Sequence, residues 1–231
     1  MIITFVRHGE VDEAYHRCYN GHNDIALSSK GREEAQRLSK VLKLKSYDAI
    51  YSSDLRRCVE TTEQLLTTVI PAKAGTHEPQ HSDNSKTLIP ALAGMTGQII
   101  SSPPHIHTST PIPIYTAQLR EKSWGIHEGM TFDAIVQRDG LVYENFEQWI
   151  TTLDGEPYDL YISRIKAFFT QTLPLTPYNN VLVVTHAGVI RVLMHLLQDI
   201  SLQEAFSINF PYSAYTTLDT ETWVFGAIKC A

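Results

Sequence analysis

The hydrophobic positions of the chain form short runs separated by longer stretches of helical spacing. Residues 2–6 read Ile-Ile-Thr-Phe-Val, residues 47–51 read Tyr-Asp-Ala-Ile-Tyr, and residues 180–185 read Asn-Val-Leu-Val-Val-Thr. Short runs that are rich in β-branched and aromatic residues predict strands, and an almost wholly apolar run such as 180–185 is typical of a central parallel strand. These runs therefore predict the interior of a β-sheet.

Helical spacing follows the first two predicted strands. Apolar residues recur at helical intervals between residues 30 and 44, after Ser28 or Ser29 as a predicted N-cap. The pattern predicts further helices over 55–69, 131–138, 143–152, 158–173 and 189–197, and one or two more strands within 207–229. Because the chain begins with a β-α-β-α order, crossover helices and parallel strands are expected. We therefore predict a three-layer α/β/α fold with a mostly parallel central sheet flanked by helices.

The stretch from 71 to 113 interrupts this order. It is rich in Pro, Gly, Ser, Thr and His and keeps neither a helical nor a strand period. A long segment of this composition is typical of a surface insertion. We therefore predict a single domain over 1–231 that carries an insertion at about 71–113. We interpret the four histidines of this stretch as solvated side chains rather than metal ligands, because few carboxylates and no cysteine accompany them.

Charge and cysteine usage narrow the range of partners. The 231 residues carry a formal net charge of -6, which argues against a general nucleic-acid or anionic-membrane partner. A local cluster of Arg and His can still bind a small anion. The chain has 3 cysteines and no Cys-x-x-Cys pair, which favours a reducing cytoplasm. We predict no signal peptide and no membrane span, and the sequence leaves monomer and dimer open.

Histidines follow two of the predicted strands. Arg7-His8-Gly9-Glu10 comes directly after the first strand, and His186-Ala187-Gly188 comes after the strand at 180–185. Because the ends of parallel strands converge on one edge of a sheet, the two histidines can share one crevice. A third junction, after Tyr51, adds Arg56 and Arg57 on the first turn of a helix. Arginines, histidines and helix N-termini together predict an anion site, and a strand-end histidine bonded only to backbone is the alternative for His8 alone.

Further motifs occur in order along the chain. The full set is Arg7-His8-Gly9-Glu10, Gly21 with Asp24, Leu27, Ser28 and Gly31, Ser52-Ser53-Asp54-Leu55-Arg56-Arg57-Cys58 with Thr61, Leu119-Arg120-Glu121 with Trp124-Gly125 and Glu128-Gly129, Gly155-Glu156 with Arg164, and Val184-Thr185-His186-Ala187-Gly188. With these motifs the chain resembles the histidine phosphatase superfamily, and its compact core is closest to the alpha-ribazole phosphatase branch. The resemblance implies a phosphoglycerate mutase-like α/β fold.

The resemblance implies a phosphohistidine cycle. His8 would be the nucleophile, and Arg7, Arg57 and His186 would hold the phosphoryl oxygens. Glu121 would protonate the leaving group and then activate water as a base. Neither a metal nor a cofactor is expected.

Two assignments have a rival nearby in the sequence. The resemblance favours Arg57 over Arg56, because Arg57 directly precedes the small residue Cys58, where the superfamily usually has Arg-Ala. Arg56 would then be a solvated helix position. Glu121 is favoured over Glu128, which is interpreted as a structural residue of the Glu-Gly turn.

The loop after His8 is less well defined. Asn20 either donates its side-chain amide to phosphate or only shapes the turn before Gly21. The resemblance also implies phosphate contacts at Gly21 and Ala187. Ala14 stands where many members of the superfamily carry a phosphate-contacting asparagine, so this loop lacks one expected donor.

The segment after Glu121 favours a phosphatase over a mutase. It passes quickly from Trp124-Gly125 to predicted helices, whereas mutases carry a long Tyr-Gly-Gly-Leu type segment there. We expect a phosphomonoesterase with a small phosphorylated substrate, and alpha-ribazole 5'-phosphate from cobalamin biosynthesis is the leading one. A phosphoglycerate mutase or a broad sugar-phosphate phosphatase is the alternative. A non-catalytic protein that binds a phosphorylated ligand is disfavoured, because Glu121 and both histidines are intact.

Overall fold

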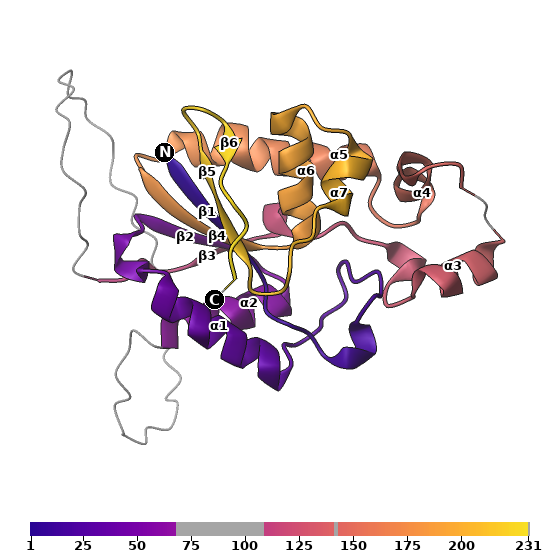
Figure 1. Cartoon of the computed structure of the whole chain (residues 1–231), viewed down its shortest axis with the longest axis horizontal. Coiled ribbons are helices and arrows are strands. Elements are labelled where there is room, and N and C mark those ends of the chain that lie inside the picture. The colour runs from indigo at the N-terminus through magenta and orange to yellow at the C-terminus, as the bar shows by residue number, and fades with distance from the viewer. Residues whose placement is uncertain (68–108, 141–142, 231) are drawn as a thin grey trace, which may run out of the picture.

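The computed structural model describes residues 1–67, 109–140 and 143–230 (Figure 1). Most of the insertion expected at about 71–113, with its four histidines, lies outside the described residues, so the domain assignment stays a prediction. Within the described ranges, no helix is long and apolar enough to cross a membrane.

The centre of the fold is a sheet with the strand order β3-β2-β4-β1-β5-β6. β1 (Ile2–Arg7), β2 (Ala49–Ser53), β3 (Ile114–Thr116) and β4 (Asn180–Thr185) run parallel to one another. β5 (Tyr215–Asp219) and β6 (Val224–Phe225) are antiparallel to their neighbours. The expectation of a mostly parallel sheet is confirmed, with β4 at its interior.

Helices cover both faces of this sheet (Figure 1). α1 (Ser29–Val41) and α2 (Arg56–Thr67) pack on one face, against Val6, Leu182 and Val184. α5 (Tyr158–Ala167) and α6 (Ala187–Gln198) pack on the other face, against Phe5, Val181 and Val183. The side chains of β4 alternate between the two cores, as the pleat of a strand buried on both faces requires. The predicted three-layer α/β/α architecture is therefore confirmed.

Three short helices build a third apolar cluster beyond the strand ends. α3 (Phe132–Asp139), α4 (Phe146–Thr152) and α7 (Leu202–Ser207) contribute Ile135, Trp149, Ile150 and Leu202, and Trp124 packs among them. Figure 1 shows α3 and α4 extending away from the sheet. This cluster forms a wall next to the carboxyl ends of the strands.

The predicted elements differ from the observed ones mainly at their ends. β2 lies two residues later than expected: its pairing with β4 begins at Ala49, and its pairing with β3 extends to Ser53. The helix expected over 158–173 leaves α-helical geometry after Ala167 and continues as a π turn, Phe168–Thr172, and a 3₁₀ turn, Leu173–Leu175. α7 was not predicted, although its capping box of Ser201 and Glu204 was readable in the sequence.

Candidate functional site

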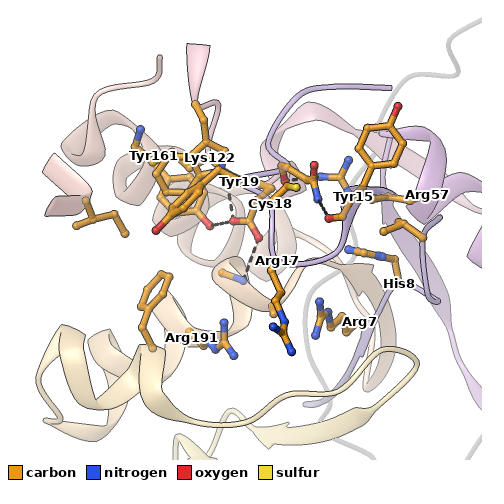
Figure 2. Close-up of a pocket in the computed structure, with 18 of the residues that line it drawn as sticks. Arg7, His8, Tyr15, Arg17, Cys18, Tyr19, Arg57, Lys122, Tyr161 and Arg191 are labelled. Carbon is orange, nitrogen blue, oxygen red and sulfur yellow. Dashed lines mark hydrogen bonds between the residues drawn. The ribbon is translucent and has the colours of Figure 1, made fainter. Parts of the chain in front are cut away.

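A cavity of about 310 Å³ opens at the carboxyl ends of β1 and β4, where the third apolar cluster meets the sheet. Figure 2 shows Arg7, His8 and Arg57 at one end of it and Tyr19, Lys122 and Tyr161 at the other. The loop before Gly21 and the first turns of α6 close its sides. Its other lining residues are Val11, Tyr15, Arg17, Cys18, Asn20, Glu121, Trp124, Phe146, Trp149, Ile150, Ala187, Gly188, Arg191, Phe206 and Tyr212.

His8 is held in one tautomer at the end of β1. Its Nδ1 lies 2.9 Å from the carbonyl oxygen of Gly9, so Nδ1 carries the proton and Nε2 keeps a free lone pair. Burial, followed by the charges of Arg57 and Arg7, holds the pKa of His8 well below its usual value. His8 is only 6% exposed yet lines the cavity. It is therefore a neutral imidazole with an unprotonated nitrogen, which is the form that a nucleophile requires.

His186 lies beside His8, with the two ring centroids 5.2 Å apart. Its Nδ1 accepts a hydrogen bond from Nε of Arg57 at 3.3 Å, so its Nε2 carries the proton and donates to Oγ of Ser53 at 2.9 Å. Burial is also the main cause that holds the pKa of His186 well below its usual value. The structure thus shows His186 as a buried partner of Arg57, and its direct contact with a phosphoryl group stays a prediction.

Arg57 reaches the site from the first turn of α2 and is 1% exposed. Its guanidinium donates to the carbonyl oxygens of Gly21 at 2.7 Å and of Asn20 and Asn23 at 3.2 Å. Arg57 therefore ties the loop that follows β1 to the end of the cavity at which His8 lies. Arg56 lies outside the cavity and pairs with Glu60 at 2.8 Å.

Among the described residues that line the cavity, Glu121 is the only one with a carboxylate. The hydroxyl of Tyr161 donates to its Oε1 at 2.6 Å, and the backbone N–H of Gly188 donates to its Oε2 at 3.1 Å. A Cβ at residue 188 would collide with this carboxylate, so glycine lets Glu121 approach the beginning of α6. The carboxylate is fixed by two elements and is exposed to the cavity, which suits proton transfer.

Glu128 has a different environment. Its two carboxylate oxygens accept hydrogen bonds from the backbone N–H groups of Gly21, His22 and Trp124, at 2.7 to 2.9 Å. This carboxylate joins two loops and does not line the cavity. On geometry, Glu121 is the candidate acid and base, and Glu128 is a structural residue.

The donor groups of the loop residues that were expected to bind phosphate are hydrogen-bonded within the protein. The side-chain amide of Asn20 donates to the carbonyl oxygen of Tyr15 at 2.6 Å, and the N–H of Gly21 is bonded to Glu128. Asn20 and Ala187 line the cavity, whereas Gly21 does not. The donors of Asn20 and Gly21 thus shape the loop, because the backbone there needs partners of its own.

The sequence analysis missed several residues that line the cavity, namely Arg17, Lys122, Tyr161, Arg191 and Tyr212. Arg191 lies four residues after Ala187, and α6, which begins at Ala187 rather than at the predicted residue 189, places both on one face. Arg17 has a φ of 59°, a left-handed conformation that no local pattern announces. Burial lowers the pKa of Lys122 to about 8, and its ammonium donates to the carbonyl oxygens of Ser123 and Asp154.

Cys58 is a buried neighbour of His186. Cys58 is fully buried, and burial raises the pKa of its thiol to about 12, so it packs as a small apolar residue.

Among the described residues, no group of three or more His, Cys, Asp or Glu side chains could hold a metal ion.

The two buried histidines predict an acid-sensitive fold. His8 and His186 resist protonation when folded, whereas the unfolded chain protonates them near their usual pKa of about 6.5. The unfolded state therefore binds more protons just below pH 6.5, and the free energy of unfolding rises with pH through this interval. Urea unfolding at pH 5, 6 and 7 should show this rise. A His186→Gln variant should show a smaller one, and equal slopes for both proteins would contradict the prediction.

Comparison with known proteins identifies the family to which the chain is similar. Residues 3–75 and 105–227 match the model of the histidine phosphatase superfamily (branch 1). The chain is 23% identical over 225 residues to the adenosylcobalamin/alpha-ribazole phosphatase of Escherichia coli, covering 95% of this chain and 90% of that one. It is 25% identical over 226 residues to phosphoglycerate mutase-like protein 4 of Arabidopsis thaliana, covering 96% and 81%.

Solved structures agree on the fold. The crystal structure of the alpha-ribazole phosphatase from Shigella flexneri superposes with a TM-score of 0.68 at 19% identity. The superposition covers 97% of this chain and 93% of that chain.

Proposed function

Because the chain belongs to the histidine phosphatase superfamily (branch 1), we propose that it hydrolyses phosphomonoesters through a phosphohistidine on Nε2 of His8. Family membership and phosphatase-named relatives make it a phosphoric monoester hydrolase that acts on small phosphorylated substrates. The proposal adds which residues carry out each step and which substrate is used.

The pairing of the arginines is the observation that carries the proposal. Arg32, Arg37, Arg56, Arg120, Arg138 and Arg164 each have a carboxylate within 3.9 Å. The remaining arginines, Arg7, Arg17, Arg57 and Arg191, all line the cavity, and none forms an ion pair with a carboxylate of the described chain. Arg57 is buried, Arg7 and Arg191 are half-buried, and Arg17 is exposed. Guanidinium groups without a counter-charge around one cavity suit a polyanionic ligand such as a phosphoryl group.

The residues around His8 support an in-line transfer. Nε2 of His8 forms the bond to phosphorus as the bond from phosphorus to the ester oxygen breaks. Arg7 and Arg57 stabilise the charge on the phosphoryl oxygens, and Glu121 gives its proton to the leaving alkoxide. Glu121 then takes a proton from water, the water oxygen attacks phosphorus, and the bond from phosphorus to His8 breaks to release phosphate. Burial keeps His8 neutral, so it is ready to attack at neutral pH.

For the substrate we propose alpha-ribazole 5'-phosphate. The end of the cavity away from His8 is walled by aromatic side chains, among them Tyr19, Trp124, Trp149 and Phe206. Such walls suit a leaving group with a flat, apolar ring system, because aromatic pairs gain from offset and edge contacts. Relatives that cover most of this chain are named alpha-ribazole phosphatases. The cytoplasmic location rests on cysteine usage and stays a prediction.

A panel of phosphomonoesters tests the function. Wild-type protein is assayed for phosphate release from alpha-ribazole 5'-phosphate, 3-phosphoglycerate, sugar phosphates and p-nitrophenyl phosphate, with and without a chelator. We expect the highest kcat/KM for alpha-ribazole 5'-phosphate and equal rates with the chelator. Conversion of 3-phosphoglycerate to its isomer would favour a mutase instead. Preference for sugar phosphates would overturn the substrate alone, and no release from any ester would overturn the proposed function.

A further inference from the structure

The segment from Phe210 to Ala214 packs along Arg7 and His8 and contacts them through most of its residues. The backbone N–H of Arg7 donates to the carbonyl oxygen of Ala214 at 3.0 Å, and the backbone N–H of Ser213 donates to the carbonyl oxygen of His8 at 3.2 Å. Nη1 of Arg7 donates to the carbonyl oxygen of Phe210. This segment, which joins α7 to β5, is therefore built around the dipeptide that carries the proposed nucleophile.

Tyr212 is the side chain of this segment that enters the cavity. Its ring covers the guanidinium of Arg7, with Cζ 3.9 Å from the ring centroid, and lies 5.6 Å from the ring of His8. Its ring also lies near that of His16, at 5.9 Å between centroids. Ser213 next to it has a φ of 55°, a left-handed conformation that is uncommon outside glycine and that turns the chain at this point.

These contacts leave one edge of Arg7 free. Nη1 is bonded to Phe210, and one face of the guanidinium lies under the Tyr212 ring. Nε is buried with no hydrogen-bond partner, and Nη2 has no protein acceptor within the described chain. The Nε and Nη2 donors form the side-on fork that binds two oxygens of a phosphate. Burial lowers the pKa of Arg7 to about 10, and Tyr212 partly opposes this, so the guanidinium stays charged at neutral pH.

We propose that Tyr212 is a positioning residue that holds the guanidinium plane of Arg7 so that its free Nε and Nη2 edge faces the phosphoryl group. Phe210 fixes one nitrogen but leaves the plane free to rotate about that bond. The ring of Tyr212 removes this rotation, and the ring of His16 contacts that of Tyr212. The inference rests on the proposed function, because it assigns the phosphoryl group to the edge that Arg7 leaves open.

Inorganic phosphate is the probe that tests this role. Its inhibition constant is measured against p-nitrophenyl phosphate hydrolysis for wild type, Tyr212→Phe and Tyr212→Leu. A cation–π contact at a desolvated site corresponds to about tenfold in a binding constant. We expect Tyr212→Leu to raise the inhibition constant about tenfold and to lower kcat/KM to a similar degree. Tyr212→Phe keeps the ring and should stay within about twofold of wild type.

A double-mutant cycle separates positioning from general stability. In an Arg7→Lys background there is no planar guanidinium to hold, so Tyr212→Leu should change the inhibition constant by less than about twofold. If the leucine variant does not fold, Tyr212→His keeps a smaller ring and should give an intermediate constant. An unchanged constant in Tyr212→Leu, or an equal loss in both backgrounds, would overturn the inference. A wild type without phosphatase activity would instead overturn the proposed function.

Discussion

His8→Ala should lower phosphatase activity to below about a hundredth of wild type, because the proposed mechanism transfers the phosphoryl group to His8. The loss of a nucleophile in a covalent mechanism commonly costs several powers of ten in kcat. Activity is measured with p-nitrophenyl phosphate, and labelled substrate is used to trap the enzyme intermediate. An acid-labile, base-stable phosphoryl label should appear on wild type and be absent from the variant.

His195→Ala is a matched control for this experiment. The ring of His195 also places Nδ1 against a backbone carbonyl, that of Ile200 at 2.6 Å, but it lies in the last turn of α6 and outside the cavity. It should keep wild-type activity and the phosphoryl label. Activity of the His8→Ala variant above about a hundredth would contradict the covalent mechanism.

Glu121→Gln should lower kcat for an alkyl phosphate by about a hundredfold to ten-thousandfold, the usual contribution of a general acid or base. The amide keeps the shape of the side chain and its reach to Tyr161 but cannot transfer a proton. With p-nitrophenyl phosphate the leaving group needs no proton, so the first step should remain fast and only the attack by water should slow. Rapid mixing should then show a burst of p-nitrophenolate, followed by slow turnover and an accumulated phosphoenzyme.

Glu128→Gln distinguishes the two carboxylates. Glu128 accepts backbone N–H groups from two loops, so its amide variant loses acceptors and should lower the midpoint of thermal unfolding. It should show no burst, because the acid and base at Glu121 is intact. A burst in Glu128→Gln and none in Glu121→Gln would reverse the assignment.

The sheet and its two helical layers were predictable because their signals are local. The run at 180–185 is apolar at almost every position, which only a strand buried on both faces requires, and β4 is that strand. Element ends were less predictable, as the π turn after Ala167 shows. Hydrogen bonds outside the segment decide such ends, and a local pattern does not contain them.

The candidate site divides in the same way. Strand-end position and helix-turn position predicted that His8, His186 and Arg57 lie near one edge of the sheet, whereas Glu121 was assigned through the resemblance to the superfamily. The role of Asn20 and Gly21 in binding phosphate stays a prediction, and in the structure their donors are bonded to Tyr15 and Glu128. Which donors remain free depends on every partner that folding brings near, and these partners are distant in the sequence.

The sequence by itself determined the layered α/β architecture, because periodicity acts over a few residues, and strand-end position placed His8 and His186 at one edge of the sheet. The tertiary structure decided the tautomer of His8, the different hydrogen-bond partners of Glu121 and Glu128, and the set of arginines left without a carboxylate. It also decided the place of Tyr212, which lies more than two hundred residues after Arg7 in the chain. In the fold, the centroid of its ring lies 3.9 Å from Cζ of Arg7. Protonation, counter-charge and stacking depend on distances between such segments, and only the folded chain sets those distances.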